Sequence, residues 1–421
     1  MKLWNSGNVR TSDLGLQTSE VRSRKSEVLR LVALLTLFTF SHYGEAAQVE
    51  VDNQCKSLKV SGETALTGAG GVILSSLSIP ADAKLVLDPI ATPICSSSTP
   101  TFGKGAKIAL SSDYKGMKLG CIVLLTYSGT ATFDQSLFDA TSVAPGATCK
   151  LTQETAPGGK NKQLVLTVGD YAHKAKDITV ALIGDSLTQG VKDRARGDCP
   201  QYRTAVAARL AAAGFRPKFV GIWKKSDLDA AGVRQPDDWT SHTGIAGAAI
   251  VATKKSVGFA DNMPRYLDTA GCPDVITLCI GSNDFIMNNK DVAETFRNFV
   301  ALVNAISAKR PNANIIGTTL PPVPNNQGAT HKALAFDNLL TSEYAKPGHG
   351  ELPDNFCLLD FVARLQNLVQ SGKVPRDLKG YCARDAHPNW RGHDLIARAF
   401  AEKISEVCPF VVMVEHARQA Y

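Results

Sequence analysis

The chain has 421 residues, enough for two or three domains with sizeable cores. With 44% hydrophobic and 20% charged residues, its composition is that of an ordinary globular protein, which excludes a disordered or fibrous chain. The net charge of +7 is not gathered into a dense basic stripe, so nucleic-acid binding is not indicated.

The first 46 residues have the pattern of a secretory signal. A basic stretch at residues 20–30 precedes an apolar run at residues 31–40, and Gly44 and Ala46 are small residues spaced as before a cleavage site. The apolar run is too short to span a bilayer, which takes about 20 apolar residues. We therefore predict export to a secreted or periplasmic location. An uncleaved anchor or a buried helix is the alternative.

Ten cysteines agree with an oxidising compartment, where disulfides persist. An even number lies on each side of residue 150, which permits disulfides within each half, although the sequence alone does not fix their connectivity. A cysteine in an apolar run, such as Cys279, is equally well explained as a free buried thiol. The His and Cys spacings do not resemble a zinc site, and we expect neither a metal nor an organic cofactor.

Residues 47–172 predict a β-rich accessory domain. Short β-type runs, such as residues 83–90 and 120–129, alternate with Gly, Pro, Ser and Asp. This pattern favours an antiparallel sandwich-like domain or a short β-roll. We interpret the domain as a spacer or packing domain rather than a polysaccharide-binding one, because it shows no row of Trp or Tyr for sugar stacking.

Residues 173–421 alternate between strand and helix patterns. Strands are expected at residues 177–184, 216–223, 273–281, 313–321 and 356–361, and helices at 201–214, 291–310 and 391–408. Such alternation predicts a three-layer α/β/α domain with a mostly parallel, flavodoxin-like sheet. Ligands of these sheets bind beyond the carboxyl ends of the strands.

Four short motifs lie at predicted strand ends or loops. Ser186 follows the first strand, Gly247 lies in the block after the second, Asn283 follows the third, and His387 precedes the last helix. A serine becomes a nucleophile when a base such as histidine and an oxyanion site are brought to it. Asp185 is expected to hold the turn, and His242 to be a loop residue or to line the substrate pocket.

The motifs GDSL, GSND and HPN, with a glycine in the second block, resemble the SGNH (GDSL-type) hydrolase superfamily over about residues 177–407. The resemblance implies that Ser186 is the nucleophile and His387 the base. It also implies an oxyanion hole formed by the backbone N–H of Ser186, by Gly247 and by the amide of Asn283. Gly244 remains an alternative to Gly247.

One position departs from the family. Its fifth block is usually Asp-x-x-His, but Arg384 stands three residues before His387, and the nearest acid is Asp385. Either Asp385 orients the imidazole, which we favour, or a backbone carbonyl replaces it and the enzyme works as a Ser–His dyad.

The sequence thus predicts a secreted serine esterase that removes small acyl groups, O-acetyl groups in the first place, from a carbohydrate or other small-molecule ester. The alternatives are a lipase or lysophospholipase and a non-catalytic binding protein on the same fold. We expect no stable membrane insertion, and the sequence gives no oligomeric state.

Overall fold

The computed structural model describes residues 47–51, 57–68, 72–156, 159–190, 202–223, 241–321, 323, 326–370, 387–388 and 390–409. Met1–Ala47 and Gln48–Tyr421 form separate compact units. The predicted signal region, residues 1–46, lies outside the described residues and stays a prediction. None of the described helices is long and apolar enough to cross a membrane.

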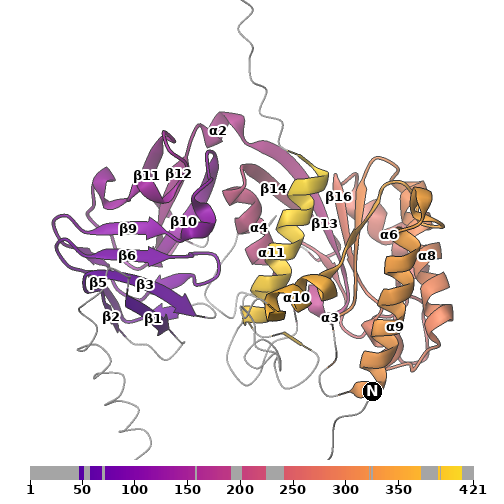
Figure 1. Ribbon diagram of the computed structural model, residues 1–421. Coiled ribbons are helices and arrows are strands. Elements are labelled where there is room, and N and C mark those ends of the chain that lie inside the picture. The colour runs from indigo at the N-terminus through magenta and orange to yellow at the C-terminus, as the bar shows by residue number, and fades with distance from the viewer. Residues whose placement is uncertain are drawn as a thin grey trace, which may run out of the picture. The chain divides into compact units, whose positions relative to one another are not determined.

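The β-rich half is built from three sheets, and from β2 to β10 consecutive strands of the chain enter the three sheets in turn. One sheet has the order β2-β5-β8, the second β1-β3-β6-β9, and the third continues from β4 through β7 to β10 (Figure 1). Each turn of chain therefore gives one strand to every sheet, as in a β-solenoid. The strands are β1 (Ala47–Val51), β2 (Ser57–Lys59), β3 (Glu63–Gly68), β4 (Val72–Leu74), β5 (Ser76–Ile79), β6 (Lys84–Leu87), β7 (Ile94–Ser96), β8 (Thr101–Phe102), β9 (Lys107–Leu110) and β10 (Gly120–Tyr127).

Apolar residues stack from one turn of this solenoid to the next. Leu58 lies opposite Leu77, and Leu85 lies opposite Ile108, with all four side chains buried. The short 3-10 helices η1 (Ser112–Tyr114), η2 (Gln135–Leu137) and η3 (Ala140–Ser142) connect the later strands. The stack explains why strands of only two to four residues persist, because each gains its core from its neighbours in adjacent turns.

The all-β character of this half is confirmed, but most of its strands pair in parallel. Antiparallel pairing joins β10 to β12 (Lys162–Val168) and β12 to β11 (Cys149–Thr155). Alternating apolar residues indicate a strand without indicating its partner. Here consecutive strands enter different sheets, so that a strand pairs with the one three places further along the chain.

The expectation of disulfides is wrong for the cysteines that the structure describes, because all of them are free: Cys95, Cys121, Cys149, Cys272, Cys279, Cys357 and Cys408. The strand register gives the reason in the β-rich half. Cys121 lies opposite Thr167, and Cys149 lies opposite Val168, so neither faces another cysteine. Cys55, Cys199 and Cys382 lie outside the described residues.

The second half is the predicted three-layer α/β/α domain. Its sheet has the order β14-β13-β16-β17-β18, with β15 paired to β13, and these strands pair in parallel. This is the flavodoxin-like order, with the first strand at the point where the connections reverse direction. The strands are β13 (Lys176–Gly184), β14 (Phe215–Val220), β15 (Thr243–Gly244), β16 (Val275–Cys279), β17 (Asn314–Thr318) and β18 (Phe356–Leu359).

Helices cover both faces of this sheet. α6, α8 and α9 lie on one face, and α4 and α11 lie on the other (Figure 1). The helices are α2 (Tyr171–Lys174), α3 (Ser186–Gln189), α4 (Tyr202–Ala212), α6 (Phe259–Ala270), α7 (Ser282–Ile286), α8 (Val292–Lys309), α9 (Gln327–Tyr344), α10 (Phe361–Gln370) and α11 (Trp390–Val407), with the 3-10 helix η5 (Pro347–His349).

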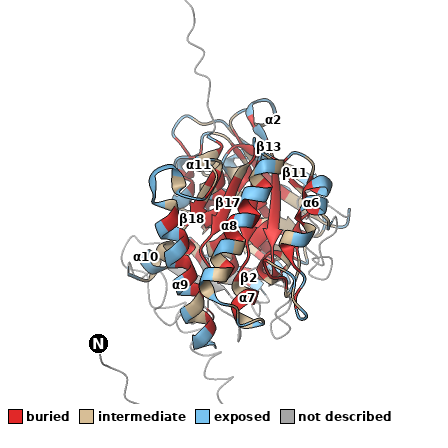
Figure 2. Cartoon of the chain, turned by 90° about the vertical axis from the view of Figure 1, so that its right-hand side faces the viewer, coloured by how far each residue is buried: buried red, intermediate tan, exposed pale blue. Residues whose placement is uncertain are grey.

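Two hydrophobic cores lie on the two faces of the sheet. Under α8 and α9, Phe299 and Phe336 meet edge to face with ring centroids 5.6 Å apart. The buried strands between the helix layers are red in Figure 2. The core on the α4 and α11 side continues without a break into the β-rich half, so that it includes both Leu166 of β12 and Val206 of α4. The boundary near residue 172 therefore separates two folding patterns that share one core.

The contact between the halves is close enough to be tested at a single glycine. A Cβ on Gly120 of β10 would lie 2.6 Å from the carbonyl oxygen of Ala212 in α4, whereas a Cβ on Gly116 would meet nothing within 4 Å. We predict that Gly120→Ala lowers the unfolding free energy by about 1–3 kcal/mol, because backbone must shift to admit the methyl group. Gly116→Ala is the matched control. Equal stability of both variants in thermal unfolding would contradict the shared packing.

Candidate active site

Ser186 lies on a tight turn between β13 and α3. The turn begins at Gly184, where a Cβ would lie 2.2 Å from Thr188 Oγ1 and 2.4 Å from the Cys279 carbonyl oxygen. Only glycine permits so close an approach. Asp185 then caps α3, since its Oδ1 accepts a hydrogen bond from the Leu187 N–H at 3.0 Å. The cap holds Ser186 half-buried at the carboxyl edge of the sheet.

His387 comes to Ser186 from the other end of the domain. Its Nε2 lies 2.9 Å from Ser186 Oγ, although the two residues are 201 positions apart. To accept the serine proton, Nε2 must be the unprotonated ring nitrogen, and Nδ1 then carries the hydrogen. α11 begins three residues later, at Trp390. Asp385 and Arg384 lie outside the described residues, so the predicted role of Asp385 stays a prediction.

Two backbone N–H groups beside Ser186 remain available for an oxyanion. Among the described residues, no acceptor is found for the N–H of Ser186 or for that of Gly247. Gly247 has a φ of 74°, which side chains rarely tolerate, and a Cβ there would have Met287 Sδ as its nearest neighbour at 3.6 Å. A Cβ at Gly247 would therefore have Met287 as its one neighbour within 4 Å among the described residues.

Gly244, the alternative donor, is engaged elsewhere. Its N–H donates to His242 Nδ1 at 2.9 Å, and a Cβ on it would lie 2.2 Å from the backbone nitrogen of Gln189. Gly244 thus serves the close packing of β15 against α3. This arrangement favours Gly247 over Gly244 as the second backbone donor.

Asn283 lies at the start of α7, buried, with its amide directed at two acceptors. Nδ2 donates to the Ala248 carbonyl at 3.0 Å and to Asp185 Oδ2 at 3.3 Å. The sequence predicted an amide free to donate to an oxyanion, whereas both hydrogens of this amide have acceptors here. The longer contact, to Asp185, is the one that an oxyanion would replace.

Asp284 was not singled out in the sequence, although it lies within the GSND motif. Its Oδ2 accepts from the Ile250 N–H at 3.0 Å, which ties the Gly247 loop to α7. Burial raises the pKa of Asp284 to about 6, and burial likewise raises that of Asp185 to about 6. The Asp185 and Asp284 carboxyls fix the loops of the site. Their burial disfavours the ionised form of both groups.

A buried polar group beneath Ser186 was also missed. Thr188 Oγ1 and Tyr202 Oη are 2.9 Å apart, and the Tyr202 ring stacks on that of His393 with centroids 6.4 Å apart. His242 is buried on the β15 side, where burial, and then the charge of Arg203, lower its pKa to about 2. His242 is therefore a neutral loop anchor. Of these residues, the sequence pointed only to His242, as a loop residue or a residue of the substrate pocket, and it gave no signal for the Thr188–Tyr202 contact.

No group of three or more His, Cys, Asp or Glu side chains suited to a metal ion occurs in the described part of the chain.

Residues 182–395 match the model of the GDSL-like lipase/acylhydrolase family. The chain belongs to this family. Among curated proteins, no relative of the sequence is found.

Solved structures with a similar hydrolase fold include three esterases. A family 3 carbohydrate esterase from Clostridium thermocellum is 22% identical, with a TM-score of 0.41 over 55% of this chain and 98% of its own. An acetyl esterase with a serine-to-alanine mutation is 17% identical, with a TM-score of 0.40 over 55% and 97%. A family 3 carbohydrate esterase from Talaromyces cellulolyticus is 18% identical, with a TM-score of 0.39 over 55% and 97%.

In this GDSL-like hydrolase, we predict that Asn283→Ala lowers turnover by on the order of a hundredfold, the cost of removing one oxyanion donor. KM should change little, because the donor acts on charge that develops in the transition state. Steady-state kinetics on a soluble ester gives both numbers. Asn288→Ala is the control, since Asn288 donates to the Asn283 carbonyl from the same loop. Equal losses in both variants would make the effect structural and remove Asn283 from the oxyanion hole.

Proposed function

We propose that the chain is a secreted serine esterase that hydrolyses small acyl esters, O-acetyl groups on carbohydrate in the first place. The observation that carries the proposal is the 2.9 Å contact between His387 Nε2 and Ser186 Oγ. A nucleophile, a base and oxyanion donors are the parts that acyl transfer needs.

The proposed reaction proceeds in two steps. His387 takes the proton of Ser186 as Oγ attacks the ester carbonyl, and the N–H groups of Ser186 and Gly247, together with the amide of Asn283, stabilise the resulting oxyanion. His387 then protonates the leaving alcohol, which leaves an acyl group on Ser186. A water molecule, deprotonated by His387, attacks this acyl-enzyme and releases the acid.

Exposed apolar side chains near the Gly247 loop support a carbohydrate substrate. Trp223, 46% exposed, follows β14 and donates from Nε1 to the Gly244 carbonyl at 2.9 Å. Met287, 38% exposed, lies beside Gly247. An indole held in one orientation loses little entropy when the apolar face of a sugar ring packs on it.

The proposed export depends on the sequence of residues 1–46. The seven described cysteines are free and add no support for an oxidising compartment.

A cavity favours a second candidate, an esterase for longer acyl chains. A cavity of about 360 Å³ lies at the carboxyl end of β17, between α9 and α10. Its Leu320 side chain lies 3.2 Å from the place of a Cβ on Gly281, the residue before α7. The apolar lining reaches toward the Asn283 turn and is formed by Leu320, Ala333, Leu334, Val362, Leu365 and Val369.

A fluorophosphonate probe tests the catalytic serine. We expect the wild-type protein to be labelled at Ser186, and we expect Ser186→Ala to abolish both labelling and ester hydrolysis. The fold should persist, because Ser186 is half-buried and the substitution removes only a hydroxyl group. A wild-type protein that is folded and unlabelled would favour a binding protein on this fold. Labelling that survives Ser186→Ala would contradict the assigned nucleophile.

The substrate class is tested by Trp223→Ala. We predict that KM for an acetylated oligosaccharide rises about fivefold, the loss of roughly 1 kcal/mol of ring packing, while KM for a simple alkyl acetate stays unchanged. Leu339→Ala is the control, since it shortens an exposed apolar side chain on α9.

An equal rise in KM for both esters would give Trp223 a structural role and contradict the sugar subsite. A kcat/KM that rises steadily from acetate to octanoate esters would favour the second candidate, an esterase that binds longer acyl chains in the cavity, over an acetyl esterase.

A further inference from the structure

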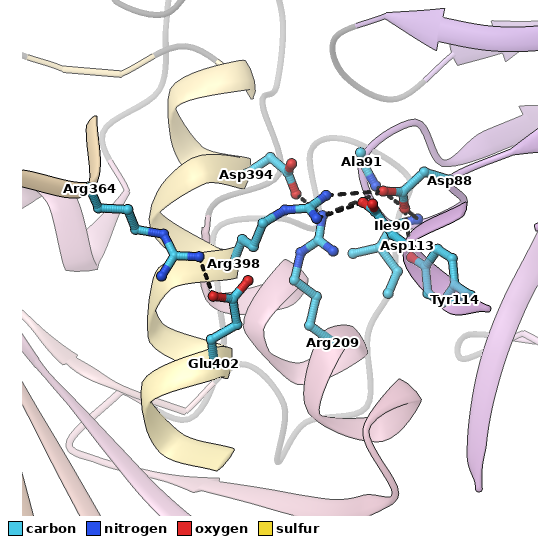
Figure 3. Close-up of polar contacts among 10 residues, drawn as sticks. All are labelled: Asp88, Ile90, Ala91, Asp113, Tyr114, Arg209, Arg364, Asp394, Arg398 and Glu402. Atoms are coloured by element: carbon cyan, nitrogen blue, oxygen red, sulfur yellow. Dashed lines mark hydrogen bonds and ion pairs between the residues drawn. The ribbon is translucent and has the colours of Figure 1, made fainter. Parts of the chain in front are cut away.

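Asp88 of the β-rich half collects polar contacts from both halves of the chain. Its Oδ1 accepts from the N–H groups of Ile90 and Ala91, each at 3.1 Å, and from Tyr114 Oη at 2.7 Å. These bonds fix its carboxylate within the loop after β6, with a side chain only 14% exposed. Its Oδ2 is turned toward the hydrolase half (Figure 3).

Two arginines of the hydrolase half meet this Oδ2. Arg398 of α11 lies 3.4 Å from it, and Arg209 of α4 lies 3.8 Å from it. Arg398 also pairs with Asp113 of η1 at 2.6 Å, and Arg209 pairs with Asp394 of α11. α11 is therefore held at two positions one turn apart, directly through Arg398 and through Arg209 by way of Asp394 (Figure 3).

The cluster is buried enough for each charge to matter. Burial alone would lower the pKa of Arg209, but the carboxylates of Asp394 and Asp88 outweigh it and raise that pKa. Burial, and then the charge of Asp88, raise the pKa of Tyr114. Removing one partner of such a buried pair leaves an uncompensated charge, which costs far more than breaking a pair in water.

The contact of Arg209 with Asp394 holds the start of α11, which is the end of the helix that follows His387 in the chain. Asp394 lies seven residues after His387, and α11 begins between them at Trp390. His393, next to Asp394, is buried against Tyr202, whose hydroxyl contacts Thr188 of the Ser186 helix. A displacement of the start of α11 therefore moves His387 relative to Ser186.

We propose that Asp88 is a positioning residue for the catalytic base: through Arg398 and Arg209 it holds the start of α11, so that His387 stays within hydrogen-bond reach of Ser186. The β-rich half is then part of the catalytic apparatus rather than a separate binding module. The proposal rests on the proposed function, because it concerns the Ser186–His387 contact.

The test is Asp88→Asn in the full chain. Asparagine keeps an Oδ1 that accepts from Ile90, Ala91 and Tyr114, and it removes the charge that faces Arg398 and Arg209. We expect kcat on a soluble ester, per serine titrated with a fluorophosphonate, to fall about tenfold or more, because small displacements of reacting groups are costly. KM should stay within about twofold, since the effect is on the reacting geometry rather than on uniform binding.

Arg398→Met provides a second variant on a more exposed side chain, and the double variant closes a cycle. Because Arg398 acts through Asp88, we expect the double variant to lose no more turnover than Asp88→Asn alone. The control is Arg364→Met, which breaks the pair between Arg364 of α10 and Glu402 of α11, a contact that does not involve the β-rich half (Figure 3). Its turnover should match that of the wild type.

The result that overturns the proposal is a normal kcat per titrated serine in Asp88→Asn, or additive losses in the double variant. An equal loss in Arg364→Met would likewise overturn it, because the effect would then follow any loosening of α11. Failure of the proposed function has a different signature: the wild-type protein itself is not labelled and does not turn over esters.

Discussion

The active-site geometry depends on one hydrogen bond, between His387 Nε2 and Ser186 Oγ, that joins the end of β13 to the start of α11. Ser186 is held by the close approach at Gly184 and by the Asp185 cap, and the loops facing it are tied together through Asp284. His387 follows the position of α11, which packs on α4 and beneath the β-rich half. The chemistry therefore draws on most of the described chain.

The position of the β-rich half explains how two unlike folding patterns make one protein. A parallel solenoid of very short strands gains its core by stacking, and its β10 covers the helix layer of the hydrolase half. At the same boundary, buried arginines face carboxylates from both halves. Apolar packing stabilises the contact between the two halves. The charged pairs set how the halves are aligned, because a buried charge without its partner is strongly destabilising.

The sequence was most informative where local pattern decides structure. The strand ends that carry Ser186 and Asn283 were predicted from buried apolar runs and the motifs that follow them, and the parallel sheet from the alternation of strands and helices. The sequence did not predict which strands of the β-rich half pair with each other. The strands of the β-rich half show the same alternation whether they pair in parallel or antiparallel, and Cys121 and Cys149 face residues that spacing does not reveal. The sequence did not indicate a role for Asp88, because its partners Arg209 and Arg398 lie on helices far along the chain.

In the proposed reaction, Ser186 carries the acyl group during turnover. The direct measurement is an acid quench of the wild-type protein in the first turnovers of an activated acetate ester, followed by peptide mass spectrometry. We expect one acetyl group on the peptide that contains Ser186, and we expect the acetylated fraction to decay as the substrate is exhausted. Steady hydrolysis with no acetylated Ser186, or acetyl groups on another residue that turn over at the same rate, would contradict it.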